Sequence, residues 1–249
     1  MTTTPSARSL LLPAAIVALG LALAGLLAGS GFVRFRTGDR TVTVKGVAER
    51  EARADLAIWP LRIVVADDDL QRASATLEGS LGTVRRFLAA QGLDQRGDEI
   101  TIGEFVVTDA RSTPGGSYQP GGRYVIRQTL VVRSTHPDRV LAASQRVAEL
   151  VRQGVVLTSG QEWGGGGPTF VFTQLNALKP TMIAEATARA REGAEQFARD
   201  SKSALGGIRR ASQGVFEILP RDQAPGISQE SQLVKTVRVV TTVEWALRD

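Results

Sequence analysis

The sequence carries no charged residue from Ser9 to Val33, and this run constrains the fold more than any other feature. It is rich in Leu, Ala and Val, with Arg8 before it and Arg34 and Arg36 after it. About 20 apolar residues in a helix cross the roughly 30 Å hydrocarbon core of a bilayer. We therefore expect one transmembrane helix, retained as an N-terminal anchor.

Two other interpretations compete with the retained anchor. A cleaved signal peptide has an apolar core of about 7–15 residues and an Ala-x-Ala-like cleavage site. Ala22-Leu23-Ala24 resembles such a site, but it lies inside the apolar run. A buried core helix is disfavoured because no polar face interrupts the run. Basic residues are enriched on the cytoplasmic side of a membrane helix. Arg8 and the terminal amine precede the run, and Arg34, Arg36 and Arg40 follow it, so the count favours a cytoplasmic C-terminal part.

The rest of the chain alternates between strand and helix patterns. We expect residues 1–40 to hold a tail, the transmembrane segment and a short linker, and residues 41–249 to form an α+β domain. Its subunits are expected at about 41–160 and 161–249. An opening strand at Thr41–Val44 precedes the first of them.

The first subunit predicts a strand, a helix and two further strands, at Asp55–Val65, Asp68–Gln91, Glu99–Thr108 and Arg123–Ser134. The helix is indicated by apolar residues at steps of three and four, and the strands by alternation. Pro60 inside the first strand indicates an edge strand or a bulge. A Gly/Pro-rich loop from Ala110 to Gly122 joins the last two strands.

The second subunit repeats this order. Before it come an expected helix and a short strand, at His136–Gln153 and Val155–Thr158. The repeat itself consists of a strand, a helix and two strands, at Phe170–Phe172, Pro180–Ala204, Ile208–Leu219 and Val234–Leu247, with a second Gly/Pro loop at Pro220–Ser228. The sequence therefore predicts duplicated β-α-β-β units, with antiparallel sheet and helices packed on one face.

Composition removes several kinds of chemistry. The chain has no cysteine, which excludes disulfides, thiolate metal sites and cysteine nucleophiles. The net charge of +5 and a pI of about 10.2 are compatible with anionic partners, but no dense basic run or aromatic-basic motif indicates nucleic-acid binding. We expect no nucleic-acid partner.

Each remaining candidate site has a simpler interpretation. Asp67-Asp68-Asp69 is interpreted as capping for the following helix rather than as a metal site, because nothing nearby supplies further ligands. His136, the only histidine, could serve a Ser-His-Asp nucleophile, but no G-x-S-x-G motif accompanies it, and we interpret it as a boundary residue. Gly164–Gly167 lacks the Lys-Ser/Thr of a phosphate-binding loop and is interpreted as a linker.

Two carboxylate pairs lie among arginines, Glu49 with Glu51 and Glu192 with Glu195, and they indicate ion pairs rather than a glycosidase pair. We therefore predict no catalytic, cofactor-binding or metal residues and no cofactor, and we expect that the protein is not an enzyme. A hydrolase that uses carboxylates or His136 stays open as an alternative.

Four stretches of the domain resemble the SIMPL-domain family of bacterial envelope proteins. They are Val42-Thr43-Val44-Lys45-Gly46 leading to Ala54-Asp55-Leu56-Ala57; Tyr124-Val125-Ile126 to Val131-Val132; Phe172-Thr173-Gln174-Leu175 with the helix through Ala184, Ala188, Ala190 and Ala198; and Leu205-Gly206-Gly207-Ile208 with Gln213-Gly214-Val215-Phe216. Two positions depart from the family pattern: Ala54 stands where many members have Pro, and Lys202 where a Gly often precedes the Leu-Gly pair.

The resemblance implies an outward-facing α+β domain, homo-oligomers and an association with oxidative or envelope stress, and it carries over no catalytic residue. It also implies a single-pass protein of the bacterial inner membrane whose C-terminal domain lies in the periplasm, which overrides the charge count. We therefore expect a non-enzymatic, membrane-anchored protein that self-assembles. The alternative is a binding module that uses its Gly/Pro hairpin loops for a small ligand, whose identity stays unknown, or for an envelope protein.

Overall fold

The computed structural model describes residues 16–27, 29, 40–94, 98–112, 122–158 and 167–248. Residues 16–27 are helical, and the expected transmembrane segment lies outside the described residues at 9–15, 28 and 30–33. Within these ranges, no helix is both long enough and apolar enough to cross a membrane.

The strands and helices alternate along the chain, as the sequence predicts. In order they are β1 (Thr41–Arg53), β2 (Leu56–Asp67), α2 (Leu70–Ala90), β3 (Asp98–Asp109), β4 (Tyr124–Ser134), α3 (Pro137–Gln145), α4 (Ala148–Arg152), β5 (Thr169–Val171), α5 (Leu175–Asp200), β6 (Ala204–Gln213), β7 (Glu217–Pro220), η2 (Gln229–Ser231) and β8 (Val234–Arg248). The α+β class with antiparallel sheets is confirmed.

The chain divides into two compact units. Unit 1 consists of Met1–Ala48, Ile183–Gly214 and Val240–Asp249, and unit 2 of Glu49–Met182 and Val215–Val239. Each unit draws on both of the expected subunits, 41–160 and 161–249. The interleaving follows from strand pairing, since β1 from the start of the domain lies beside β8 from its end.

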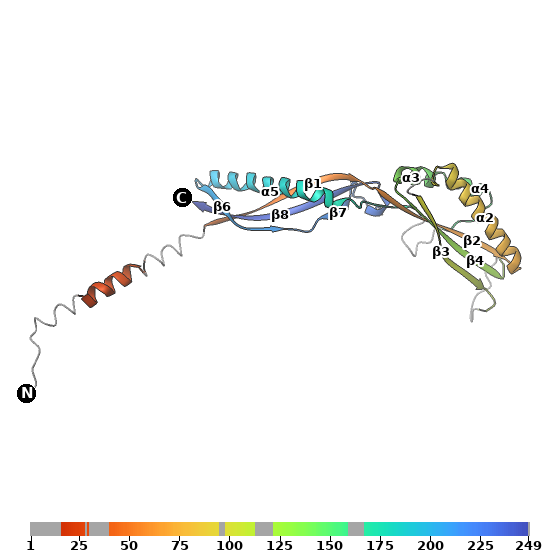
Figure 1. Ribbon diagram of the computed structural model, residues 1–249, viewed down its shortest axis with the longest axis horizontal. Coiled ribbons are helices and arrows are strands. Elements are labelled where there is room, and N and C mark those ends of the chain that lie inside the picture. Colours follow the sequence, from red (N-terminus) through yellow and green to blue (C-terminus); the bar gives the residue numbers. More distant parts are fainter. Residues whose placement is uncertain are drawn as a thin grey trace, which may run out of the picture. The chain divides into compact units, whose positions relative to one another are not determined.

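Unit 2 is built on an antiparallel sheet in the order β3-β4-β2-β5. Leu61 of β2 lies opposite Leu130 of β4, and Ile100 of β3 lies opposite Val132. The helices α2, α3 and α4 cover one face of this sheet (Figure 1). On that face β2 buries every second side chain, namely Ala57, Trp59, Leu61, Ile63 and Val65. This alternation follows from the two-residue period of a strand.

Helix α2 confirms the helix expected at Asp68–Gln91. Asp69 caps its start, because the carboxylate accepts a hydrogen bond from the backbone N–H of Arg72 at 2.9 Å. The helix ends where Gly92 adopts a φ of 71°, a conformation that favours glycine. Its buried face carries Ala73, Leu77, Ser80, Val84, Phe87 and Leu88. Leu70, expected on this face, is 44% exposed because it is the first residue of the helix.

The sequence indicated that Pro60 could mark an edge strand. This is wrong, because β2 has partners on both sides. On the side away from β4, pairing covers Leu56–Ile58 through β5 and resumes where Thr158 donates to the carbonyl of Arg62. The N–H of Val64 points to the same side, where it donates to Val156. The nitrogen of Pro60 therefore points into the gap between these partners, where no hydrogen bond is lost.

The helix expected at His136–Gln153 is two helices. The chain turns at residues 146 and 147 between α3 and α4, where the Arg146 N–H bonds to Ala143, three residues back. The short strand expected at Val155–Thr158 is reduced to one antiparallel bridge, Ile63 with Leu157.

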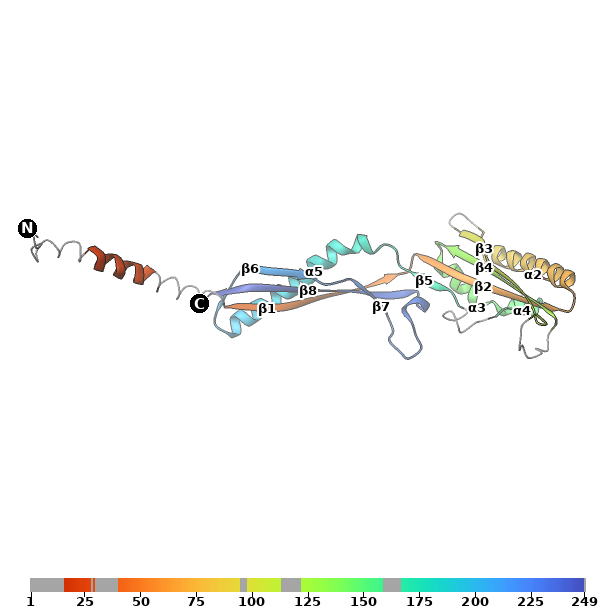
Figure 2. The same ribbon diagram turned by 90° about the horizontal axis from the view of Figure 1, so that it is seen from below.

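Unit 1 places α5 on a sheet in which β8 lies between β1 and β6, as Figure 2 shows. The expected alanine stripe is buried, since Ala186, Ala190 and Ala194 have no exposed surface. On β1, the small residue Gly46 lies against this stripe. A Cβ atom added to Gly46 would lie 1.8 Å from the carbonyl oxygen of Ala186, so only glycine fits there. Val243 and Trp245 of β8 complete this core.

Helix α5 begins five residues earlier than Pro180, the expected start, and holds this proline inside it. The segment before the helix is fixed by Asp55, whose carboxylate accepts hydrogen bonds from the N–H and the hydroxyl of Thr173. The helix also ends earlier than Ala204. Lys202 stops it by adopting a φ of 54°, which is uncommon for a residue with a side chain.

The duplicated β-α-β-β arrangement holds in element order but not in pairing. β5 was expected to open the second subunit, at 161–249. It pairs instead with Leu56–Ile58 of β2, in the sheet of unit 2. β1 takes the place beside β8 instead. β1 has thirteen residues and β5 three, so β1 can form the longer ladder beside the fifteen-residue strand β8.

Candidate functional site

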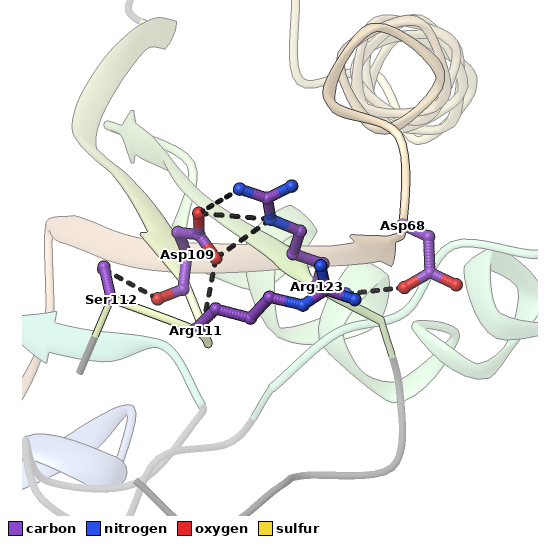
Figure 3. A network of polar contacts seen from close by, with 5 residues as sticks. All are labelled: Asp68, Asp109, Arg111, Ser112 and Arg123. Carbon is purple, nitrogen blue, oxygen red and sulfur yellow. Dashed lines mark hydrogen bonds and ion pairs between the residues drawn. The ribbon is translucent and has the colours of Figure 1, made fainter. Parts of the chain in front are cut away.

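The base of the first Gly/Pro loop is held by charged side chains (Figure 3). Arg123 donates from Nε and Nη2 to the carboxylate of Asp109, at 3.0–3.3 Å, across the two strand ends. The Asp109 carboxylate also accepts from the N–H of Arg111, and its carbonyl accepts from the hydroxyl of Ser112. Asp68 accepts from the N–H of Arg123 at 3.0 Å. Residues 113–121, the rest of the loop, lie outside the described residues.

The acidic run at residues 67–69 serves structure in three different ways. Asp69 caps α2 and Asp68 holds the Arg123 backbone, while Asp67 accepts two hydrogen bonds from the guanidinium of Arg72. The Arg72 guanidinium, aided by the Asp69 N–H, lowers the pKa of Asp67 to about 2. The capping interpretation is confirmed for Asp69, and among the described residues no group of three or more His, Asp or Glu side chains could hold a metal ion.

His136 lies in a cluster with Asp98 and Ser134 at the boundary between β4 and α3. The Ser134 hydroxyl donates to Asp98, and the His136 N–H donates to the Ser134 Oγ at 2.9 Å. The ring Nδ1 lies 3.4 Å from Asp98, not against the hydroxyl. In a nucleophilic triad the imidazole accepts the serine proton. Here the carboxylate accepts it, and Ser134 is fully buried, so the arrangement is that of a structural hydrogen-bond cluster.

The other sequence candidates are the two carboxylate pairs and the glycine run. Glu49 lies 3.4 Å from Arg238 in an ion pair, as the sequence indicates. Of the glycine run, only Gly167 lies within the described residues. Glu192 and Glu195 both lie on α5 in unit 1, whereas Glu49 and Glu51 lie in unit 2.

The second Gly/Pro loop encloses a small hollow at its base. A cavity of about 190 Å³ is lined by Arg221, Asp222, Gln232, Leu233 and Val234. The Gln232 amide donates to the carbonyl of Asp222 at 2.8 Å and accepts from its N–H, which ties the two sides of the loop together. Nearby, Lys235 is 2% exposed and donates to the carbonyl of Gln229, and burial lowers its pKa.

The outer edge of β3 carries an apolar strip that the sequence did not reveal as a surface feature. Ile102, Phe105 and Val107 are 59%, 56% and 44% exposed. They lie on the face of the sheet that α2 covers, because they stand opposite Leu130, Gln128 and Ile126 of β4. Helix α2 packs mainly on β2 and β4, and the three side chains on β3 remain about half exposed.

A β-bulge creates this strip. The register with β4 shifts between Ile102 and Phe105, so Gly103 and Glu104 share one partner residue. Without the extra residue, Phe105 would point to the opposite face from Ile102. The amide of Gln128, which is 5% exposed, donates to the carbonyls of Gly103 and Glu104 and fixes the bulge. The spacing I-x-I-x-x-F-x-V is the one signal that could have indicated it.

A family model described as "SIMPL: Protein of unknown function (DUF541)" matches residues 42–245. No curated protein matches the chain. A crystal structure of an amidase of the hydantoinase/carbamoylase family from Burkholderia phymatum is 18% identical, with a TM-score of 0.25. The match covers 59% of this chain and 35% of the amidase, so this chain spans about a third of that protein. A TM-score this low supports no statement about fold or activity.

Proposed function

We infer a function for this chain, which belongs to the SIMPL family, from its own geometry, because the family model carries no assigned function. We propose that it is a non-enzymatic, membrane-anchored protein of the cell envelope that acts by self-association. Its domain lies in the periplasm in this proposal, and the uncharged run from Ser9 to Val33 supplies the anchor.

The observation that carries the proposal is the exposed apolar strip of Ile102, Phe105 and Val107 on β3, which is an end strand of its sheet among the described residues. An edge strand presents unpaired N–H and C=O groups that can pair with another chain. Soluble monomers cover such edges or place lysine and proline on them. Strand β3, DEITIGEFVVTD, contains neither lysine nor proline.

The test is the molar mass of the full chain in mild detergent, measured by light scattering after size exclusion. We expect an assembly larger than a monomer, and we expect Phe105→Lys to reduce its mass because a charged side chain would have to be desolvated in the interface. Phe197→Lys is the matched control: Phe197 is 59% exposed, close to the 56% of Phe105, but lies on α5. A monomer at high concentration would contradict the proposal.

The proposed role in oxidative or envelope stress tolerance rests on the family resemblance. We expect a strain that lacks the protein to survive peroxide or detergent stress less well than its parent. Expression of the wild-type chain should restore survival, whereas Phe105→Lys should not if self-association is the active property. Equal survival of all strains would contradict the role in stress.

A binding module is the second candidate, favoured by the hollow at the base of the loop around Arg221 and Asp222. Long loops in compact domains tend to be functional. Both loops have firmly held bases, the first through Asp109 and Arg123. Replacing residues 113–121 and 223–227 by short glycine linkers should abolish partner binding in this case. If every interaction of the protein survived both replacements, the candidate would fail.

A further inference from the structure

We propose that β3 pairs with β3 of a second copy, antiparallel and about a two-fold axis that passes between Gly103 and Glu104. This inference rests on the proposed self-association and names the surface that would carry it. The resulting interface is isologous, so the same residues serve both partners.

The edge is available for such pairing. Strand β3 is the end strand of its sheet, with β4 on one side and no strand of the described ranges on the other. The opposite end of the sheet is less open, since β2 is paired by β5 at Leu56–Ile58 and by the bridge at Leu157. This twelve-residue edge lacks lysine and proline, two of the usual protections against strand addition. It does carry a bulge and four acidic residues, and the proposed register has to accommodate them.

The strand is self-complementary when read in opposite directions. About the proposed axis, position i of one copy meets position 207 − i of the other. The facing pairs are Asp98 with Asp109, Glu99 with Thr108, Ile100 with Val107, Thr101 with Val106, Ile102 with Phe105, and Gly103 with Glu104. Every apolar residue of the strip therefore faces an apolar residue of the partner, on the same face of the joined sheet.

The charges permit this register. Glu99 would meet Thr108, and Glu104 would meet Gly103, so neither carboxylate faces another. The end pairs bring Asp98 against Asp109, and the two Glu104 residues lie one position apart across the axis, each opposite Gly103 of the other copy. Asp109 is already neutralised by Arg123, whose hydrogen bonds lower the pKa of Asp109, and Asp98 already accepts from Ser134 beside His136.

The bulge has a definite place in this arrangement. A bulge on an edge strand ordinarily disrupts pairing. Here Gly103 and Glu104 lie on the axis, which leaves regular strand on either side, Asp98–Ile102 and Phe105–Asp109. The bulge also keeps Ile102 and Phe105 on one face, so that both halves of the strand contribute to the same apolar strip.

Because the chain has no cysteine, pairs of introduced cysteines test this register without background. The experiment mixes the full-length Thr101→Cys and Val106→Cys chains in mild detergent under oxidising conditions. Directly facing residues have Cβ atoms about 4.5–5.5 Å apart, which suits a disulfide after small adjustment. We expect disulfide dimers that contain one chain of each kind, identified by intact mass spectrometry.

Each variant alone is the control. In the proposed register Thr101 of one copy lies five positions from Thr101 of the other, about 17 Å along the strand, so neither variant should link to itself. Light scattering could show an assembly while the mixture forms no more disulfide dimers than the single variants do. That result would overturn the β3 pairing and leave self-association intact. A protein that is monomeric by light scattering would overturn both.

Discussion

The two compact units both place a helix on an antiparallel sheet, but with side chains of very different size. In unit 2 the buried residues include Trp59, Ile63 and Leu88, whereas the helix in unit 1 meets its sheet through Ala190 and Ala194. Large buried side chains leave a cavity when they are shortened. A close approach of backbones leaves no room when a methyl group is added. The comparison therefore predicts that shortening a buried side chain destabilises unit 2 most, whereas adding a methyl group destabilises unit 1 most.

The largest effect is expected for Trp59→Ala in unit 2. Trp59 is 1% exposed in the core beneath the helices, and truncation of a buried Trp to Ala typically costs about 3–5 kcal/mol. Urea unfolding of the full chain, followed by far-UV circular dichroism, measures the change in unfolding free energy. Phe197→Ala on the exposed side of α5 is the control and should change stability by less than about 0.5 kcal/mol. Equal losses for both variants would contradict the assignment of the core.

Addition of a methyl group in unit 1 is expected to have the next largest effect. Gly46→Ala places a Cβ atom 1.8 Å from the Ala186 carbonyl oxygen and 2.6 Å from the Ala190 nitrogen. Overpacking typically costs about 1–3 kcal/mol, and here backbone atoms must move.

The control for Gly46→Ala is the same substitution in unit 2, Gly79→Ala. Gly79 lies inside α2 with nothing within 4 Å of the added atom, so alanine should stabilise the helix by about 0.5–1 kcal/mol. The same urea titration should therefore show changes of opposite sign. A gain in stability for Gly46→Ala would mean that α5 does not lie against β1 as described.

A gain of stability is expected at the end of α5. Lys202 holds a φ of 54°, and this conformation costs a residue with a side chain about 1 kcal/mol relative to glycine. Lys202→Gly should raise the unfolding free energy by about that amount, whereas Lys202→Ala should not. If both variants had the same stability, removal of the lysine side chain and not the backbone conformation would explain the change.

Local patterns along the sequence predict the elements well because their causes are local. Steps of three and four along residues 70–88 predict α2, and the carboxylate before it predicts the cap that Asp69 makes. The alternation in Val234–Leu247 predicts β8 in the same way. Lys202, noted as a departure from glycine, adopts a backbone conformation in which glycine would be the better residue.

Pairing between distant segments could not be predicted because it depends on which edges are free after the long strands have paired. The short strand β5 was expected in the second subunit but pairs with β2, and β1, whose partner was not predicted, lies beside β8. The apolar strip was missed for a related reason. Alternation assigns Ile102 and Phe105 to opposite faces, and only the bulge fixed by Gln128, a residue from another strand, returns them to one face.

The smallest effect concerns Asp67, which stabilises the start of α2 through Arg72 at the surface of unit 2. Its pKa is lowered from 3.8 to about 2 in the folded chain, chiefly by hydrogen bonds from Arg72. A carboxyl group with a depressed folded pKa stabilises the fold above its unfolded pKa, and this contribution is lost as pH falls through the folded value. The stabilisation that Asp67 contributes should therefore be lost as the pH is lowered from about 4 to about 2.

Unfolding free energies measured at pH 5, 4, 3 and 2 should fall less steeply for Asp67→Asn than for the wild-type chain. A double-mutant cycle with Arg72→Gln identifies the partner, since the coupling between the two sites should disappear over the same pH range. Coupling at pH 2 that was as large as at pH 5 would show that the two side chains interact through packing and not through the ionised carboxylate. The loss expected for Gly46→Ala comes from overlap with uncharged backbone atoms, so it should not depend on pH in the same titration.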